Sequence, residues 1–168
     1  MMRKAIPFSL LLILLTTACS AALASASVAS PENGAQAPEF SLETLEGDSL
    51  SISDLRGQVV LVNFWATWCG PCRLEMPALQ ARFENTDLAV LAVNFDESPE
   101  QVQAFVDELG LTFPTLLDPG GDTQLLYQVR GYPTSYLIDE EGTIQIVHIG
   151  FMNDDQLDGY LTELGLLN

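Results

Sequence analysis

The chain has 168 residues, 48% of them hydrophobic, and a formal net charge of −17. Its length fits one domain with a short appendage, and its apolar content excludes a wholly disordered chain. The negative charge argues against nucleic acid or anionic lipid as a partner, because both present negative phosphates.

The first residues predict a secretory signal. Arg3 and Lys4 precede an apolar run, Ala5–Leu15, which is too short for a comfortable membrane span, and small residues follow. We therefore assign residues 1–24 to a signal peptide and expect the mature protein to lie outside the cytoplasm.

How this signal is processed stays open. The stretch ending at Cys19 resembles the lipobox of bacterial lipoproteins, where the cysteine receives a lipid, although Thr16 stands where a leucine is usual. Ordinary cleavage near Ala24 or Ala26 is the alternative. We favour lipidation, because Cys19 would otherwise be exported as an exposed free thiol.

The rest of the chain divides into a linker and a domain. Residues 25–36 are rich in Ser, Ala, Pro and Gly and have no hydrophobic period, which predicts a flexible tether. Residues 37–168 are expected to form the folded domain.

Alternating and apolar runs in this domain predict a mixture of strands and helices. Residues 40–45 and 49–52 flank a Glu-Gly-Asp turn and form a hairpin. The apolar run 59–64 is a buried strand, and the helix after it carries Met76 and Leu79 on one face. The later elements expected are a strand at 88–95, a helix at 98–110, an extended segment at 112–117, a helical turn at 123–129, paired strands at 134–138 and 143–150, and a helix at 154–164.

Two cysteines, Cys69 and Cys72, stand where the strand 59–64 passes into its helix. A helix N-terminus offers free N–H groups and the positive end of the helix dipole, and both favour a thiolate over a thiol. We expect Cys69 to be an exposed nucleophile and Cys72, one turn further in, to be a shielded resolving thiol. The alternatives are a structural disulfide or half of a zinc site, which needs about four ligands.

The pentapeptide 68–72, Trp-Cys-Gly-Pro-Cys, resembles the active site of the thioredoxin superfamily. Glu75 and Pro77 follow at the spacing of the extracytoplasmic TlpA/ResA-like branch, whose redoxin domain is of the AhpC/TSA kind. The resemblance covers roughly residues 37–168. It implies an α/β thioredoxin fold, with a central mixed sheet flanked by helices, an N-terminal β-hairpin and a βα insertion.

Glu75 is the candidate acid–base group. It lies three residues after Cys72, so both leave one helical face about 5–6 Å apart at Cβ. A partly buried carboxylate there would have a raised pKa and could take a proton from Cys72; an exposed first-turn glutamate is the alternative. Cytoplasmic thioredoxins bury an aspartate in the preceding strand, where this chain has Asn63, which cannot titrate.

A second stretch, Gly-Tyr-Pro-Thr at 131–134, resembles the cis-proline loop that faces the cysteines in this superfamily. A trans proline before a strand is the alternative. Trp65 and Trp68 are expected beside the site or in the core. The residues that the resemblance assigns to substrate binding are Trp68, Gly70, Pro71, Tyr132 and Pro133.

These features predict an enzyme, a thiol–disulfide oxidoreductase that is secreted or tethered to the membrane and needs no cofactor. Gly70 and Pro71, with no histidine between the cysteines, resemble reducing members of the superfamily; thioredoxin itself lies near −270 mV. The expected partners are disulfides of exported proteins, such as apocytochrome c or copper-site proteins, and a membrane electron donor of the thiol–disulfide relay type.

Two other functions remain as alternatives. A Sco-like Cu(I) chaperone would use two thiolates and His148, but Sco-like proteins have three residues between their cysteines. A peroxiredoxin-like peroxidase would need a threonine three residues before Cys69, where Ala66 stands. We interpret His148, within an alternating strand, as structural and predict no metal site.

Overall fold

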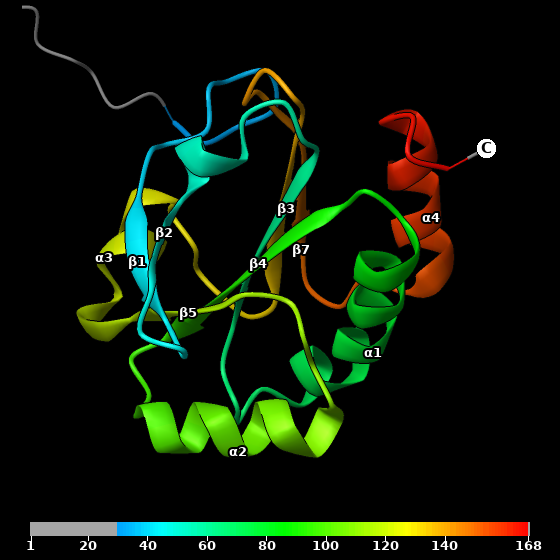
Figure 1. Ribbon diagram of the computed structural model, residues 1–168. Helices are drawn as coiled ribbons and strands as arrows, with labels where there is room; N and C mark the ends of the chain where they lie inside the picture. Colours follow the sequence, from blue (N-terminus) through cyan, green and yellow to red (C-terminus); the bar gives the residue numbers. More distant parts are fainter. Residues whose placement is uncertain (1–29, 168) are drawn as a thin grey trace, which may run out of the picture.

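The structure, a computed structural model, describes residues 30–167 (Figure 1), so the predicted signal and Cys19 lie outside the described residues. The elements are β1 (Ser41–Thr44), β2 (Ser49–Ser51), the 3-10 helix η1 (Ile52–Leu55), β3 (Val60–Trp65), α1 (Gly70–Asn85), β4 (Ala89–Phe95), α2 (Pro99–Leu109), β5 (Thr115–Asp118), the 3-10 turn η2 (Pro119–Gly121), α3 (Asp122–Leu126), β6 (Thr134–Ile138), β7 (Ile144–Ile149) and α4 (Asp154–Glu163).

A mixed seven-stranded sheet forms the centre of the domain, in the order β2-β1-β5-β4-β3-β6-β7. β3 pairs in parallel with β4 and antiparallel with β6, and β4 pairs in parallel with β5. The hairpin of β1 and β2 joins the sheet where β1 pairs antiparallel with β5. This is the predicted thioredoxin fold, with its N-terminal hairpin and an inserted β5–α3 unit.

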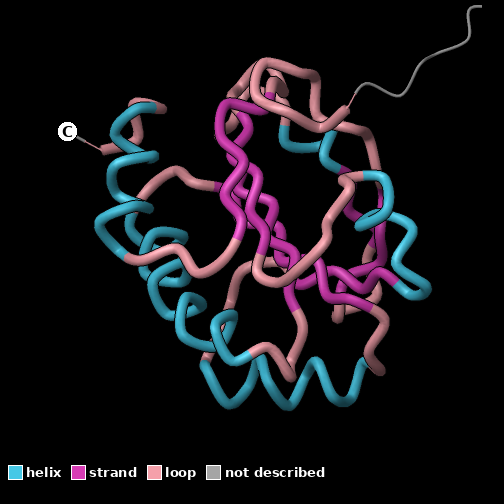
Figure 2. Tube along the Cα trace, turned by 180° about the vertical axis from the view of Figure 1, so that it is seen from behind, coloured by secondary structure: helices cyan, strands magenta, loops and turns pink. Residues whose placement is uncertain are grey.

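The side chains of β3 alternate between two apolar clusters, one on each face of the sheet. Leu61 and Trp65 belong to the cluster that includes side chains of α1, α2 and α4, whereas Phe64 belongs to the cluster that contains Tyr127, just after α3. Figure 2 shows α1, α2 and α4 along one side of the strands. By the same alternation Asn63 lies on the face that α1 covers.

Local signals in the sequence determine the helix ends. Ser98 and Gln101 form a capping box at the start of α2. This helix ends at Gly110, whose φ of 63° lies in the left-handed region that glycine tolerates. A second capping box, of Asn153 and Gln156, begins α4. The start of α4 matters for the site, because the residue before this cap contacts Glu75.

Two predicted segments are shorter than expected. The extended segment 112–117 becomes a strand only at β5, because Pro114 has no N–H to donate to a ladder. The helical turn predicted at 123–129 ends with α3, and Gln128 then takes a left-handed φ of 54°. This turn leads the chain into the cis-proline loop.

Residues 31–36 were predicted to be part of a flexible linker, and this prediction is wrong. Gly34 N–H donates to Ile144 O at 2.7 Å, and Ile144 N–H donates to Ala35 O at 2.8 Å. The start of β7 has a free edge whose backbone groups need partners, and this segment supplies them. The ordered domain therefore begins near Pro31, which is buried.

Both described ends of the chain lie toward the end of the domain away from the start of α1, on opposite sides of the sheet (Figure 1). The contacts agree, since residues 34–36 pair with the first residues of β7, whereas the last, Ile149, pairs with Thr134 beside the cis-proline loop. Within residues 30–167 no helix has the length and apolar character needed to cross a membrane.

Candidate active site

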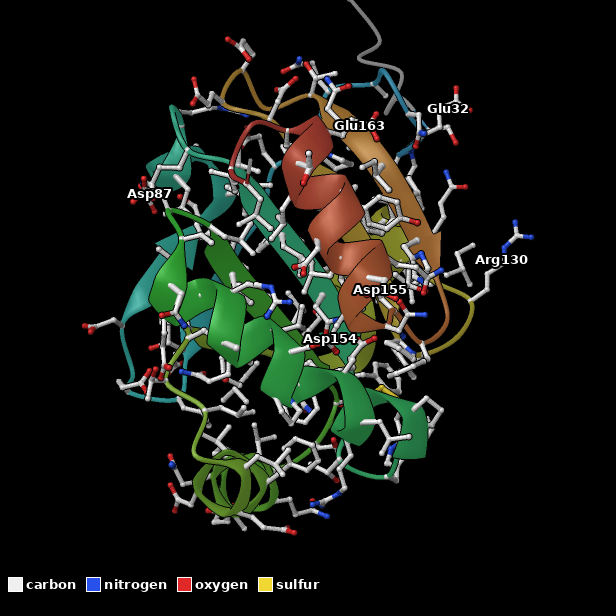
Figure 3. The ribbon with its side chains drawn as sticks, turned by 90° about the vertical axis from the view of Figure 1, so that its right-hand side faces the viewer. Glu32, Asp87, Arg130, Asp154, Asp155 and Glu163 are labelled. Atoms are coloured by element: carbon white, nitrogen blue, oxygen red, sulfur yellow. A yellow bond between two sulfur atoms is a disulfide. The ribbon has the colours of Figure 1, made fainter. Side chains whose placement is uncertain are left out.

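The two cysteines form a disulfide at the N-terminus of α1. Their sulfurs are 2.04 Å apart, and Cys69 is the N-cap residue of the helix. The backbone N–H of Cys72 donates to Cys69 Sγ at 3.1 Å. The strand β3 ends four residues before Cys69, so the sheet and the helix together hold the disulfide in place; Figure 3 shows sulfur in yellow beside α1.

The expectation that Cys69 is exposed is wrong for this oxidised state. Cys69 is 5% exposed and Cys72 is 0% exposed, and both belong to the apolar cluster beneath α1. The disulfide turns the Cys69 sulfur toward Cys72, which explains this burial. The asymmetry between the two cysteines remains, because Cys69 lines an open groove and Cys72 does not.

Glu75 is buried beneath the first turns of α1, with 1% of its surface exposed. Asn63 Nδ2 donates to Glu75 Oε1 at 2.7 Å, and Met152 N–H donates to Glu75 Oε2 at 3.0 Å. The same Asn63 amide donates to Ser135 Oγ at 2.9 Å. The carboxyl group is therefore held by β3 and by the segment before α4.

Burial raises the pKa of Glu75 to about 7, and the two hydrogen bonds from Met152 and Asn63 oppose the rise only in part. Asn63 Oδ1 is buried and has no hydrogen-bond partner among the described residues. If the Asn63 amide turned over, this oxygen would accept a hydrogen bond from protonated Glu75. The site can thus accommodate both protonation states of the carboxyl group near neutral pH.

The loop opposite the disulfide contains the cis peptide bond Tyr132–Pro133 that the resemblance implied. Tyr132 stacks on Phe95 with ring centroids 5.8 Å apart, and Trp68 meets the Tyr132 ring edge-on at 5.6 Å. The Tyr132 hydroxyl donates to the side-chain oxygen of Gln124. These contacts fix the loop from both sides.

Trp68 is 67% exposed, whereas Trp65 is fully buried in the core. An open groove of about 510 Å³ runs between the disulfide and the cis-proline loop. The predicted substrate-binding residues Trp68, Gly70, Pro71 and Tyr132 line this groove together with Cys69 and Arg130, and Pro133 is buried behind it. The structure thus gathers the predicted site residues around one opening.

Glu97, which the sequence did not single out, holds the loop in front of Cys69. Its carboxylate accepts the Thr67 N–H at 2.7 Å, the Thr67 hydroxyl, and Asn94 Nδ2 at 2.8 Å. Asn94 is fully buried at the end of β4. Three hydrogen bonds to one carboxylate tie the cysteine loop to the neighbouring strand.

His148 lies apart from this constellation. Its Nδ1 is 3.0 Å from the Tyr160 hydroxyl, and its Nε2 is 3.2 Å from Phe151 O. Both ring nitrogens therefore have partners: Tyr160 joins His148 to α4, and Phe151 belongs to the segment between β7 and α4. Residues 30–167 contain no cluster of three or more His, Cys, Asp or Glu side chains placed to hold a metal.

Comparison with known proteins identifies the family of this chain. Residues 33–147 match the AhpC/TSA family. The chain belongs to this family. The thioredoxin-like protein YneN of Bacillus subtilis is 49% identical over 132 residues, which are 76% of this chain and 77% of YneN. The thiol-disulfide oxidoreductase ResA of Oceanobacillus iheyensis is 38% identical over 138 residues, 78% of this chain and 72% of ResA.

A solved structure agrees with these sequence relatives. A crystal structure from Chlorobium tepidum, of a protein described as the thiol:disulfide interchange protein DsbE, superposes with a TM-score of 0.72 at 37% identity. The match covers 81% of this chain and 98% of that one. The AhpC/TSA family member described here is thus a TlpA/ResA-like thiol–disulfide oxidoreductase with a thioredoxin fold.

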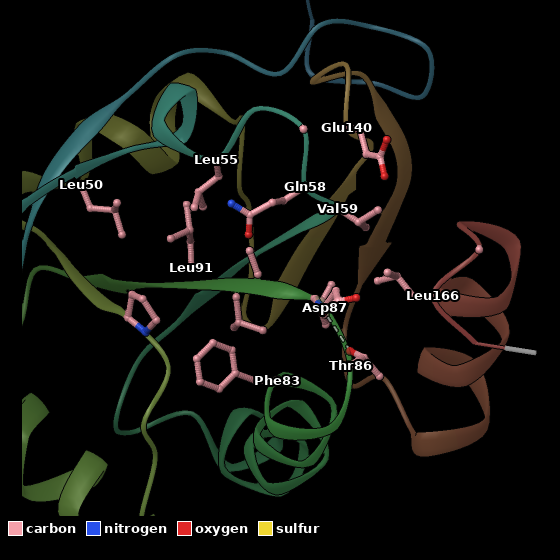
Figure 4. Close-up of a pocket in the computed structure, with 16 residues that line it drawn as sticks. Leu50, Leu55, Gln58, Val59, Phe83, Thr86, Asp87, Leu91, Glu140 and Leu166 are labelled. Atoms are coloured by element: carbon pink, nitrogen blue, oxygen red, sulfur yellow. Dashed lines mark hydrogen bonds between the residues drawn. The ribbon is translucent and has the colours of Figure 1, made fainter.

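A larger hollow, of about 790 Å³, is shown in Figure 4, and it shares no lining residue with the groove beside the disulfide. Val59 and Leu88, before the parallel strands β3 and β4, line it with Phe83 and Thr86 from the end of α1 and Leu166 near the C-terminus. The cysteines come after the other end of β3. The larger of the two hollows is therefore not the reactive site.

Three polar groups near the site escaped the sequence reasoning. An asparagine within the apolar run 88–95, Asn94, was a usable signal, because a polar residue in a buried strand needs a partner. Arg130 directly precedes the cis-proline loop and could have been noted for that reason. Glu97 gives no signal, since an acidic residue in a loop before a helix is usually solvated.

Proposed function

We propose that the protein is a thiol–disulfide reductase that acts outside the cytoplasm on disulfides of exported proteins. The observation that supports this most is the asymmetry of the Cys69–Cys72 pair. One sulfur borders an open groove, and the other is fully buried on the helix face that carries Glu75. A cysteine reachable by a partner and a second one reachable only from within are what disulfide exchange requires.

The cycle begins with both cysteines reduced. The Cys69 thiolate attacks one sulfur of the partner disulfide, the partner S–S bond breaks, and the first partner sulfur leaves as a thiolate that takes up a proton. Cys72 then loses its proton and attacks Cys69 Sγ, which breaks the mixed disulfide and releases the second partner sulfur. The partner gains two electrons, and the cysteine pair loses two as it forms the disulfide seen in the structure.

Glu75 is the proposed acceptor of the Cys72 proton. It is buried on the same helix at the i, i+3 spacing, and its pKa of about 7 lets it take up and return a proton near neutral pH. The unpaired Oδ1 of Asn63 provides a partner for the protonated form. The proton thus stays inside a site that bulk water does not reach.

Trp68, Gly70, Pro71 and Tyr132 are proposed to bind the substrate chain along the groove, with Pro133 shaping its wall. We propose the reducing direction because Gly70 and Pro71 separate the cysteines and no histidine stabilises the thiolate between them. Apocytochrome c and copper-site proteins are the proposed substrates, and a membrane thiol–disulfide donor is proposed to return the electrons.

The decisive experiment is a trap with Cys72→Ser. This variant lacks the resolving thiol, so the mixed disulfide through Cys69 should persist in cell envelopes, appear on a non-reducing gel and be identified by mass spectrometry. The variant with both Cys69 and Cys72 replaced is the matched control, and because it retains Cys19 it shows any partner that is held through a Cys19 thiol. Partners held by Cys69→Ser but not by Cys72→Ser would reverse the two roles, and no partner in either variant would contradict the reductase proposal.

The proposed location is the outer face of the cytoplasmic membrane, with a lipid on Cys19. Ser30, the first described residue, follows Cys19 by eleven positions, and a flexible chain of that length would span roughly 18 Å on average. The ordered domain starts at Ser30, whose hydroxyl accepts a hydrogen bond from Gln128 at 3.4 Å, so such a tether would leave the domain beside the hollow that Pro31 and Arg130 line. Mass spectrometry of the native N-terminus tests this: a mature chain that starts at Ser25 or Ser27 without an acyl mass would exclude the tether.

A further inference from the structure

The charge around the groove differs from the charge of the rest of the molecule. The chain has 23 acidic and 6 basic residues. Within residues 30–167, three arginines pair with carboxylates: Arg56 with Glu39, Arg73 with Glu108 at 2.6 Å, and Arg82 with Asp154 and Asp158. The fourth, Arg130, makes no ion pair within these residues.

Arg130 stands at the groove beside the disulfide. It lines the hollow that contains Cys69, and it also lines a neighbouring hollow that reaches Ile149 at the end of β7. All other residues that line the two hollows are uncharged. The two adjoining hollows therefore form a surface that runs from the disulfide along the cis-proline loop. No carboxylate lines this surface, and Arg130 is its single charged residue.

The backbone under Arg130 is held in place, although its side chain is exposed. Val129 N–H donates to Gln124 O at 2.9 Å on one side, and Tyr132 is fixed by Phe95 and Trp68 on the other. Figure 3 shows the Arg130 side chain extending away from the domain. A guanidinium on a fixed base, with no internal carboxylate, can offer its donors to an incoming group.

We infer that Arg130 is a specificity residue that binds a carboxylate of the partner chain close to the partner's reactive cysteine. The inference rests on the proposed function and adds a substrate class to it: extended protein segments with an acidic side chain near the disulfide. The molecule as a whole repels acidic partners, but salt screens this repulsion beyond about 8–10 Å. A carboxylate at the edge of the groove meets the exposed Arg130 side chain at much shorter range, and no acidic side chain lines the groove to compete with it.

The test uses a series of disulfide-linked peptides. Each carries a single glutamate at one of the four positions on either side of the cysteine, and each has a matched peptide with glutamine at that position. The second-order rate constant for their reduction by the reduced full-length protein is measured. At one or two positions the glutamate peptide should react about fourfold faster, in line with the strength of an exposed arginine–carboxylate pair. This ratio should fall to about one in Arg130→Gln, and in Arg130→Glu it should fall below one, because the two carboxylates then repel each other.

Arg56→Gln is the matched control, because it removes the same charge at the other end of the domain and should keep the fourfold ratio. The ratio should also shrink as salt is raised. Equal rates for all glutamate and glutamine peptides, or a glutamate preference that survives in Arg130→Gln, would overturn the assignment of Arg130 while leaving the reductase intact. A parent protein that reduces none of the peptides would instead refute the proposed function.

Discussion

Replacing Glu75 by glutamine should change how the stability of the oxidised domain depends on pH. Burial raises the pKa of Glu75 from 4.5 to about 7. Each pKa unit corresponds to about 1.4 kcal/mol, so the shift amounts to about 3 kcal/mol between the two protonation states. This free energy is the cost of a buried negative charge held by only two hydrogen bonds, from Asn63 and Met152.

The sign follows from proton binding. The unfolded chain loses the Glu75 proton near pH 4.5, whereas the native domain keeps it until about pH 7. Between these values the native state binds more protons, so the free energy of unfolding falls as pH rises. The stabilisation is complete below pH 4.5 and is lost as pH rises through about 7. Glu75→Gln has no such proton and should lack this part of the slope.

The assay is urea unfolding of the disulfide-bonded protein from pH 4.5 to 8. The free energy of unfolding of Glu75→Gln minus that of the parent should rise by up to about 3 kcal/mol across this range, with unchanged m-values. The variant should fold, because the unpaired Asn63 Oδ1 can accept a hydrogen bond from the new amide. Glu46→Gln, at an exposed residue in the β1–β2 turn, is the control and should give a flat difference. A Glu75→Gln curve as flat as this control would refute the reasoning.

Three further predictions concern the cysteines and their surroundings. Equilibration with glutathione should give the Cys69–Cys72 couple a reducing potential, and a value above about −150 mV, near the strong oxidants, would contradict this. Trp68→Ala should slow reduction of protein disulfides about tenfold, as loss of an exposed aromatic anchor does, while unfolding free energy changes by less than about 0.5 kcal/mol; equal rates with parent and variant would show that Trp68 does not touch the partner. Glu97→Gln should lower the free energy of unfolding by about 1–3 kcal/mol, because an amide has one acceptor oxygen for the two donors of Thr67 and the one of Asn94. An unchanged urea midpoint would show that these hydrogen bonds do not stabilise the domain.

The sequence by itself determined the order of the elements and the position of the cysteines. The apolar period of 59–64 predicts a buried strand, and the pattern after Cys72 predicts a helix, so the strand-to-helix junction follows from local patterns alone. The capping box of Ser98 and Gln101 likewise depends on residues three apart. Such features depend only on residues close together in the sequence, so the sequence alone predicts them.

The environment of the predicted groups was decided by tertiary structure. The spacing of Glu75 from Cys72 allowed either a buried base or an exposed first-turn glutamate. Only the packing of β3 and of Met152, 77 residues later in the chain, buries the carboxyl group and raises its pKa. The burial of Cys69 in the oxidised state follows in the same way from the core that encloses the disulfide.

The wrong linker prediction and the residue that the sequence did not single out both involve contacts between segments far apart in the chain. The stretch 31–36 has the composition of a linker, yet the free edge of β7 orders it, because backbone groups pair whatever their side chains are. Arg130 stands out only once the fold shows that the groove beside Cys69 has no other charge. Composition and period describe a residue and its near neighbours, whereas burial, ion pairing and the charge of a groove depend on elements that the fold brings together from distant parts of the chain.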